Sequence, residues 1–135
     1  MTLHVELVDP EREIWSGEAE MVIARTLDGE IGILNNHAPI IGVLYEGSTV
    51  QIRPQHAAEG NGDVFAAVTG GFLSVADNRV SILARQGQLG SEVDTATAQA
   101  ALDQAIEAAG PAANAPEEPA EIRYYRSLLL ASQAR

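Results

Sequence analysis

A change of hydrophobic period near Gly90 constrains the fold of this chain more than any other feature of its sequence. Before this point, apolar residues alternate with polar ones, as in Leu3, Val5 and Leu7. A period of two is typical of strands that bury one face. After this point the alternation stops, and most residues are good helix formers with many alanines. The sequence therefore predicts a β half followed by a helical half.

The β half is divided by turn signals rich in glycine, asparagine and aspartate, at intervals of about 8 to 16 residues. No helical pattern lies between the alternating segments, which argues against a parallel sheet built from βαβ units. Short strands joined by tight turns are typical of an all-β sandwich or barrel. We expect residues 1–90 to form an all-β N-terminal sandwich of two packed sheets.

The helical half, residues 91–135, is expected to form an α-helical antiparallel hairpin. Asp94 or Thr95 can cap a first helix that runs to about Ala109, where Gly110 and a following proline stop it. Residues 110–119 form a linker that is too proline-rich for regular structure. A second helix is expected from near Pro119 to the C-terminus, and the short connection makes the two helices antiparallel.

The hairpin is expected to be only weakly held. In the first helix the large apolar residues are Leu102 and Ile106, and alanines complete the stripe. In the second helix Ile122, Tyr125 and Leu129 share one face, and Leu128 and Leu130 spread beyond it. An alanine seam buries little apolar area, so opening should cost on the order of a few kcal/mol. A marginal element of this kind can serve as a switch.

Charge and composition exclude several function classes. The net charge of −11 argues against nucleic acid as a partner, because phosphate binding needs a basic face. Cysteine is absent, which excludes thiolate metal sites and disulfides. The first residues do not resemble a signal peptide, and no run of about 18 apolar residues occurs. Any membrane association is therefore expected to occur only through partners.

Neither metal binding nor catalysis is predicted. His4, His37 and His56 lack the spacing of a metal-ligand pair. The serines show no G-x-S-x-G motif. The segment Thr69-Gly70-Gly71 lacks the lysine and the spacing of a phosphate-binding loop, and indicates a bulge or close packing between sheets instead.

Two motifs point to a known family. Residues 28–39 read DGEIGILNNHAP, with glycines on both sides of Glu30 and with His37 before the closing Ala-Pro. Residues 70–75 read GGFLSV, and residues 80–84 read VSILA. In this order and spacing, the segments resemble the signatures of the epsilon subunit of F-type ATP synthases. The resemblance is close over residues 1 to about 94 and extends to the rest only in type.

This resemblance implies a non-catalytic subunit of the central stalk. Such a subunit would bind the gamma subunit and the membrane rotor ring of c subunits, and would couple rotation driven by proton flow to ATP synthesis. Its C-terminal helices would restrain ATP hydrolysis through transient contact with the catalytic hexamer of alpha and beta subunits. The resemblance places the chain at the cytoplasmic face of the bacterial cell membrane, as a peripheral protein.

The resemblance also assigns roles to particular residues. Glu30 and His37 match positions at the end of the β domain that faces the rotor ring, although His37 could instead serve only the loop in which it lies. Three arginines of the second helix match a surface that contacts acidic segments of the catalytic subunits when the helix extends: Arg123, Arg126 and Arg135. The alternative for these arginines is a solvated face that complements the helix dipole.

A nucleotide motif of bacterial members is incomplete in this chain. Members that bind ATP carry [IL]-D-x-x-R-A at the start of the first helix. Asp94 and Ala98 are retained here, but Thr97 stands in place of the arginine. Because a neutral hydroxyl cannot pair with a phosphate as an arginine does, ATP is not expected as a cofactor. Many members also carry a proline where Asn35-Asn36 stand before His37, but asparagine tolerates the left-handed geometry of a turn.

Two other function classes remain open from the residues alone, since a sandwich hosts many functions. The first is a free-standing β-sandwich binding module with a helical dimerisation tail, which would need an aromatic-lined pocket. The second is a small lyase or isomerase in a β-barrel, which would need histidines and carboxylates that converge inside a cavity.

Overall fold

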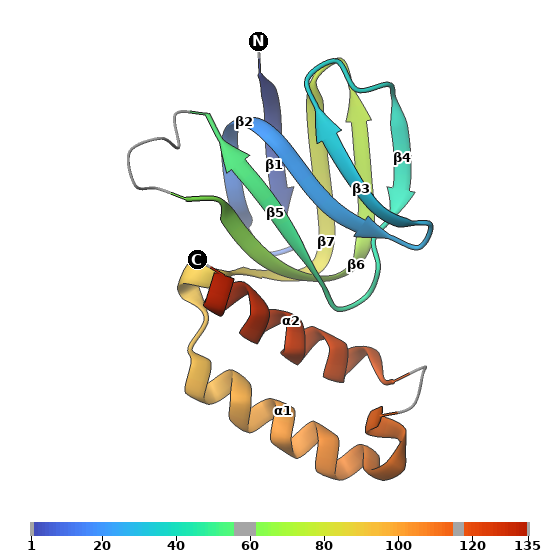
Figure 1. Cartoon of the computed structure of the whole chain (residues 1–135), viewed down its shortest axis with the longest axis vertical. Helices are drawn as coiled ribbons and strands as arrows, with labels where there is room; N and C mark the ends of the chain where they lie inside the picture. Colours follow the sequence, from blue (N-terminus) through green and yellow to red (C-terminus); the bar gives the residue numbers. More distant parts are fainter. Residues whose placement is uncertain (1, 56–61, 115–117, 135) are drawn as a thin grey trace.

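The computed structural model describes residues 2–55, 62–114 and 118–134. It shows a β-sandwich with two helices packed against one end (Figure 1). The strands are β1 (Leu3–Val8), β2 (Glu13–Thr26), β3 (Gly29–Leu34), β4 (Ile40–Val43), β5 (Ser48–Pro54), β6 (Val64–Ala76) and β7 (Arg79–Leu89). The short 3-10 helix η1 (Gly90–Glu92) then leads to the helices α1 (Thr95–Ala109) and α2 (Ala120–Ala134), between which lies the 3-10 helix η2 (Gly110–Asn114).

The expected all-β sandwich followed by a helical hairpin is confirmed. The two layers of the sandwich belong to one hydrogen-bonded sheet. The strand order is β1-β7-β6-β5-β2-β3, with β4 paired to β6 and β1 also paired to β2. The long strands β2 and β6 each pair with strands of both layers, and the register of β2 against β5 shifts between Ala19 and Met21. Strands that bend in this way turn the corner between layers, so one hydrogen-bonded sheet folds onto itself.

The alternating residues of the strands fill the space between the layers. Leu3, Val5 and Leu7 of β1 are fully buried, as the period of two predicts. The same cluster contains the large side chains Ile33, Leu44, Ile52, Leu73 and Ile82. Every member of this cluster precedes the helices in the chain. The sandwich therefore has a core of its own.

The paired glycines of β6 mark a close backbone approach. Gly70 and Gly71 have φ angles of 65° and 103°, which favour glycine. A Cβ on Gly71 would lie 2.8 Å from the carbonyl carbon of Leu83 in β7. The pairs on either side, Thr69 with Gln86 and Gly71 with Ala84, keep one register, so this point is not a bulge. The close contact is with the neighbouring strand of the same layer.

The first helix begins and ends close to the expected residues. Asp94 is the N-cap of α1, and its carboxylate accepts a hydrogen bond from the Thr97 amide at 3.1 Å. At the other end Gly110 has a φ of 60°, and its amide donates to the Ile106 carbonyl. This pattern satisfies one of the carbonyls that the last helical turn would leave free.

The expectation that the linker 110–119 lacks regular structure is wrong for its first half. Gly110–Asn114 forms the 3-10 helix η2, and Ala113 is fully buried against the hairpin. Pro111 does not prevent this, because a proline in a first turn lacks only an N–H that would be unpaired there. Residues 115–117 of the linker lie outside the described residues.

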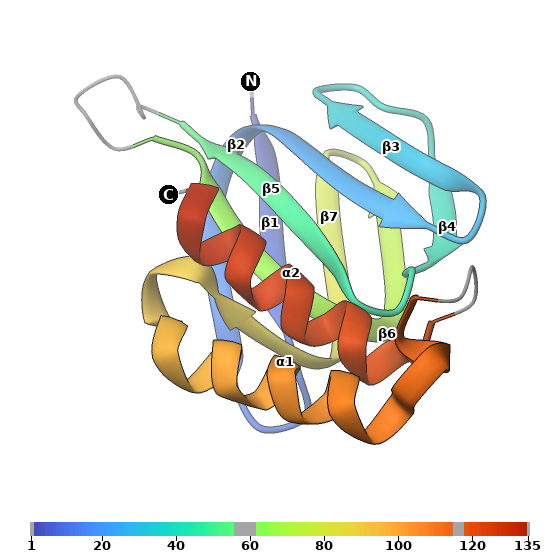
Figure 2. The same ribbon diagram turned by 60° about the horizontal axis from the view of Figure 1, so that its bottom comes forward.

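Helix α2 lies between the sandwich and α1 (Figures 1 and 2). Its buried residues are Ile122, Tyr124, Ser127, Leu128, Leu129, Ala131 and Ser132, whereas Leu130 is 60% exposed. By contrast, α1 buries only Ala98 and Leu102 among its described side chains. Leu128 extends the buried surface of α2 beyond one face, as the sequence indicates, whereas Leu130 does not, and Tyr124 adds to this surface. The position of α1 depends on α2.

We predict that the helices are the least stable part of the chain and that a chain ending at Ser91 still melts cooperatively. The physical reason is that the sandwich core contains no residue of the helices. Amide exchange should be faster in α1 and α2 than in the strands. Leu102→Ala should accelerate exchange in the helices alone. Leu73→Ala should lower the free energy of unfolding of the sandwich by about 2–5 kcal/mol. Loss of cooperative melting in the shortened chain would show that the hairpin belongs to the core.

Candidate functional site

Glu30 and His37 lie at opposite ends of the edge strand β3. Glu30 is exposed near the start of β3, where its backbone pairs with Arg25 of β2. His37 lies in the loop after β3, and its amide donates to the Leu34 carbonyl at 3.1 Å. The six residues of β3 span about 20 Å. The structure therefore does not bring the two residues together, but places both along one edge of the sandwich, here called the β3 edge (residues 29–37).

The loop that carries His37 is tied to the neighbouring β6–β7 turn. Asn36 has a φ of 68°, as a left-handed asparagine can adopt, and its amide donates to the Asn78 side chain at 2.6 Å. The imidazole Nδ1 of His37 lies 2.7 Å from the Ala38 carbonyl. The position of His37 is thus set by its loop, while its side chain remains accessible at the end of the β3 edge.

A cleft of about 650 Å³ is lined on one side by the sandwich and on the other by α2 and the segment before it. Three arginines line this cleft: Arg25 of β2, and Arg123 and Arg126 of α2. We call it the arginine cleft. Glu30 also lines it, so the cleft continues to one end of the β3 edge. The sequence motifs gave no sign that Glu30 and the arginines of the second helix share a wall.

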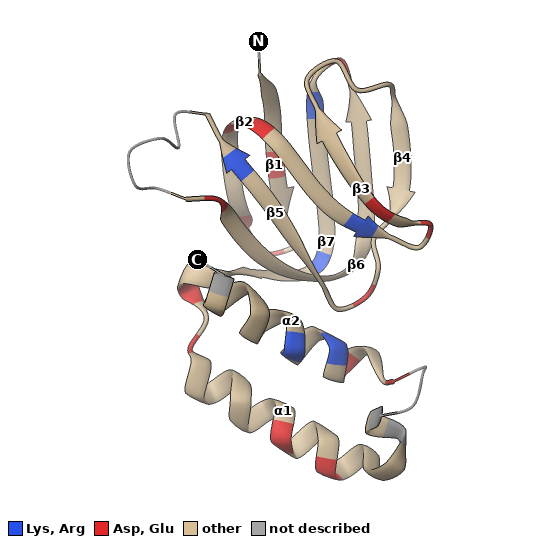
Figure 3. Cartoon of the chain, in the orientation of Figure 1, with Lys and Arg blue, Asp and Glu red and all other residues tan. Residues whose placement is uncertain are grey.

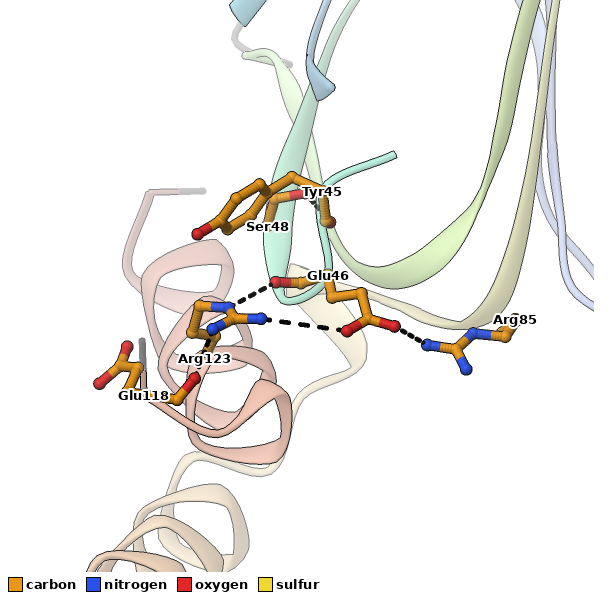
Figure 4. A network of polar contacts seen from close by, with 6 residues as sticks. All are labelled: Tyr45, Glu46, Ser48, Arg85, Glu118 and Arg123. Atoms are coloured by element: carbon orange, nitrogen blue, oxygen red, sulfur yellow. Dashed lines mark hydrogen bonds and ion pairs between the residues drawn. The ribbon is translucent and has the colours of Figure 1, made fainter. Parts of the chain in front are cut away.

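Arg123 is engaged by the turn between β4 and β5 (Figure 4). Its Nε donates to the Glu46 carbonyl at 2.9 Å, and its NH2 group lies 3.9 Å from the Glu46 carboxylate. The guanidinium also lies 5.1 Å from the centre of the Tyr45 ring, within the range of a cation–π contact. The opposite oxygen of the Glu46 carboxylate accepts a hydrogen bond from Arg85 of β7.

The other arginines named from the sequence are placed differently. Arg126 forms an ion pair with Glu118 at 2.9 Å, so its partner lies just before its own helix. The side chain of Arg126 is 40% exposed, against 22% for Arg123. Arg135 lies outside the described residues. Chemically the cleft favours anions, but the charges of Arg123 and Arg126 are already balanced by protein carboxylates.

The residues of the nucleotide motif do not line the arginine cleft. The Asp94 carboxylate caps α1, and its hydrogen bond with the Thr97 amide lowers the pKa of Asp94 below its ordinary value. Ala98 is buried under the hairpin, while Thr97 is exposed. Because α1 and α2 are antiparallel, Asp94 at the start of α1 lies near the end of α2, away from Arg123 in the first turn of that helix. Figure 3 shows the basic residues of α2 in its middle and toward its start.

An exposed row of apolar side chains crosses the outer face of β4, β6 and β7. Val43 pairs with Phe72 and Phe72 pairs with Leu83, so the three lie side by side across the strands. They are 44%, 56% and 50% exposed, and Ile41 of β4 is 78% exposed. We call these four residues the outer apolar row. Contiguous apolar surface on a folded domain marks an interaction site.

Sequence reasoning missed the outer apolar row and the residues that hold Arg123. The signal for the row was present, because Val43, Phe72 and Leu83 occupy outward positions of alternating strands. Glu46 and Gly47 lie between two strands, and a turn sequence alone does not indicate which helix packs on it. Tyr124 was not assigned to the buried face of α2, but its burial raises the pKa of its hydroxyl to about 12.

Two further classes of site find no support in the described part of the chain. There, no group of three or more histidines and carboxylates is arranged to hold a metal ion. His56 lies outside the described residues. None of the described helices combines the length and apolar character that crossing a membrane requires.

Comparison with known proteins places these features in a family. The family model described as the ATP synthase Delta/Epsilon chain, beta-sandwich domain, matches residues 2–90. The ATP synthase epsilon chain of Thermobifida fusca is 51% identical over 104 residues, which are 76% of this chain and 74% of that protein. The epsilon chain of Streptomyces coelicolor is 48% identical over 103 residues, which are 76% of this chain and 79% of that one.

Two solved structures share the fold at lower sequence identity. A chain of the Euglena gracilis mitochondrial ATP synthase, in a structure of OSCP, F1 and c-ring, matches with a TM-score of 0.70 and 21% identity, covering 99% of this chain and 82% of that one. A chain of the Tetrahymena thermophila central stalk and c-ring structure matches with a TM-score of 0.59 and 19% identity, covering 99% and 96%. At such identities these matches support the fold alone.

Proposed function

This chain belongs to the family of ATP synthase epsilon chains, and from this membership we propose that it is a non-catalytic subunit of the central stalk. In this role it couples rotation driven by proton flow to ATP synthesis in the catalytic hexamer. The observation that carries the proposal is the family match across the whole sandwich, together with relatives about half identical in sequence. It acts at the cytoplasmic face of the bacterial cell membrane, held there by its partners.

The gamma subunit is proposed to bind to the outer apolar row. A stalk subunit has to transmit torque, which requires a permanent interface, and permanent interfaces are large and apolar. The outer apolar row is exposed on three neighbouring strands, and these strands are part of the hydrogen-bonded sheet rather than a loop. A rigid apolar face of this kind suits permanent attachment to a second stalk subunit.

We predict that Phe72→Asp lowers recovery of the gamma subunit with a tagged copy of the chain purified from native membranes. A carboxylate in the centre of an apolar contact has to be desolvated without a partner, and this weakens binding. Leu34→Asp is the matched control, because Leu34 is 59% exposed but lies on β3. Failure of the parent chain to recover any ATP synthase subunit would refute the proposed function itself.

The β3 edge is the proposed contact with the membrane rotor ring of c subunits. It offers one exposed carboxylate, Glu30, at its start and the accessible imidazole of His37 at its end. Two polar groups, one near the start of a strand and one in the loop after its end, can contact more than one polar loop of a ring. Charged groups at such a rim set orientation more than affinity.

We predict that Glu30→Lys lowers ATP-driven proton pumping per ATP hydrolysed in reconstituted membranes, because it inverts one charge of this contact. The lysine would also face Arg25 across the β2–β3 pair, which is unfavourable for like charges. Glu30→Gln removes the charge without this repulsion and should show a smaller loss. Unchanged pumping in the lysine variant, with an unchanged melting temperature, would count against the β3 edge as the ring contact.

The hairpin is proposed to restrain ATP hydrolysis by leaving the sandwich and extending toward the alpha and beta subunits. Its second helix carries Arg123 and Arg126, which can pair with acidic segments. Its contact with the sandwich includes small residues such as Ala67 and Ala131, which bury little area. A contact of this kind can open without unfolding the sandwich core.

ATP is not proposed as a cofactor of this chain. Thr97 cannot replace the phosphate-binding arginine of the family motif, and the retained Asp94 is used as a helix cap. We predict that calorimetry with the purified chain detects no ATP binding in the micromolar range. Thr97→Arg, which restores the family arginine, is the matched gain-of-binding variant. Tight binding by the parent chain would overturn this assignment.

A further inference from the structure

The turn between β4 and β5 receives the first part of α2 at very close range. A Cβ on Gly47 would lie 2.6 Å from the carbonyl carbon of Arg123 and 2.6 Å from the amide nitrogen of Tyr124. These are backbone atoms of a helix, which cannot move aside one at a time. Gly47 also has a φ of 72°. Only glycine therefore fits this turn while α2 is docked.

The turn is held in shape by contacts that do not involve α2. The Tyr45 amide donates to the Arg25 carbonyl of β2 at 2.9 Å. The Ser48 hydroxyl donates to the Tyr45 carbonyl at 2.9 Å, closing the turn from the other side. The Glu46 carboxylate pairs with Arg85 of β7. Since these partners all belong to the sandwich, the turn is a preformed seat for α2.

The guanidinium group of Arg123 makes most of its contacts with this turn. Three of its contacts go to the turn: the Glu46 carbonyl, the Glu46 carboxylate and the face of Tyr45. A fourth contact, a hydrogen bond from NH1 to the Glu118 carbonyl, goes to the segment that precedes α2. With its side chain only 22% exposed, Arg123 has little surface left for a second acidic partner.

We propose that Tyr45, Glu46 and Gly47 form a latch that withholds Arg123 from acidic partners for as long as α2 is docked. Release of α2 leaves Glu46 paired with Arg85, so no carboxylate of the turn loses all its partners. Arg126 keeps Glu118 in either state, because both lie on the moving segment. The latch thus makes the partners of Arg123 depend on docking of α2, whereas the partner of Arg126 does not change.

The latch is tested first in the free full-length chain by amide exchange. Gly47→Ala and Arg123→Gln should each accelerate exchange in α2 by about tenfold or more, because overpacking or lost pairing favours the undocked state. Two matched controls should behave like the parent. Gly29→Ala introduces the same residue at a φ of 118° with no atom within 4 Å of its Cβ. Arg126→Gln removes an arginine whose ion pair does not reach the sandwich.

The outcomes of this test are distinct. Faster exchange in α2 with unchanged exchange in the strands, in both latch variants and neither control, supports the latch. Equal exchange in Gly47→Ala and Gly29→Ala overturns it. If Gly47→Ala also accelerates exchange in the strands, the substitution has unfolded the turn itself. The Arg123→Gln variant then decides whether the latch exists, and unchanged exchange of α2 in that variant overturns it.

The consequence for an acidic partner rests on the proposed function and is tested in the assembled enzyme. Gly47→Ala frees the hairpin and leaves Arg123 intact, so the enzyme assembled with this variant should hydrolyse ATP more slowly than the enzyme with the parent chain. Arg123→Gln frees the hairpin without its contact group and should not show this slowing. If the enzyme with the chain ending at Ser91 hydrolyses ATP no faster than the parent, the proposed restraint fails, while the exchange result still decides the latch.

Discussion

The close approach of α2 to the sandwich is the contact on which the arrangement of the C-terminal half depends. It occurs at two glycines, Gly47 and Gly90, where a Cβ would lie 2.6 Å from the backbone of Arg123 and of Ala131 respectively. Between these points the helix presents the small buried residues Ser127 and Ala131. Because α1 packs mainly on α2, loss of this contact would release both helices together.

Two arginines of this acidic chain join segments that are distant in sequence. Arg12 pairs with Glu92, 80 positions away, and Arg85 pairs with Glu46, 39 positions away. Exposed pairs of this kind contribute about 0–1 kcal/mol each, so they define geometry more than they stabilise the fold. Arg123 differs, because its pairing with Glu46 joins α2 to the sandwich, which is the basis of the latch proposed above.

Much of the fold follows from local patterns that the sequence shows directly. The alternation of Leu3, Val5 and Leu7 predicts the buried face of β1, and Asp94 predicts the start of α1. Local patterns fail to predict the structure where tertiary contacts override the local composition. Gly110–Asn114 becomes a 3-10 helix because Ala113 is buried against the hairpin, which no local rule for a proline-rich linker includes. Likewise, Glu30 and His37 are close in sequence, but six extended residues of β3 hold them apart.

The sequence by itself determined the order of strands and helices, the approximate start of α1 and the family, because each depends on residues near one another in the chain. Only the tertiary structure decided that Arg123 lies in the turn of Glu46 and Gly47, that Glu30 shares a cleft with α2, and that Val43, Phe72 and Leu83 form one exposed row. The contact of Arg123 with Glu46 joins residues that are 77 positions apart. Their geometry is fixed by strand register and helix docking, and both depend on packing between elements rather than on any local pattern.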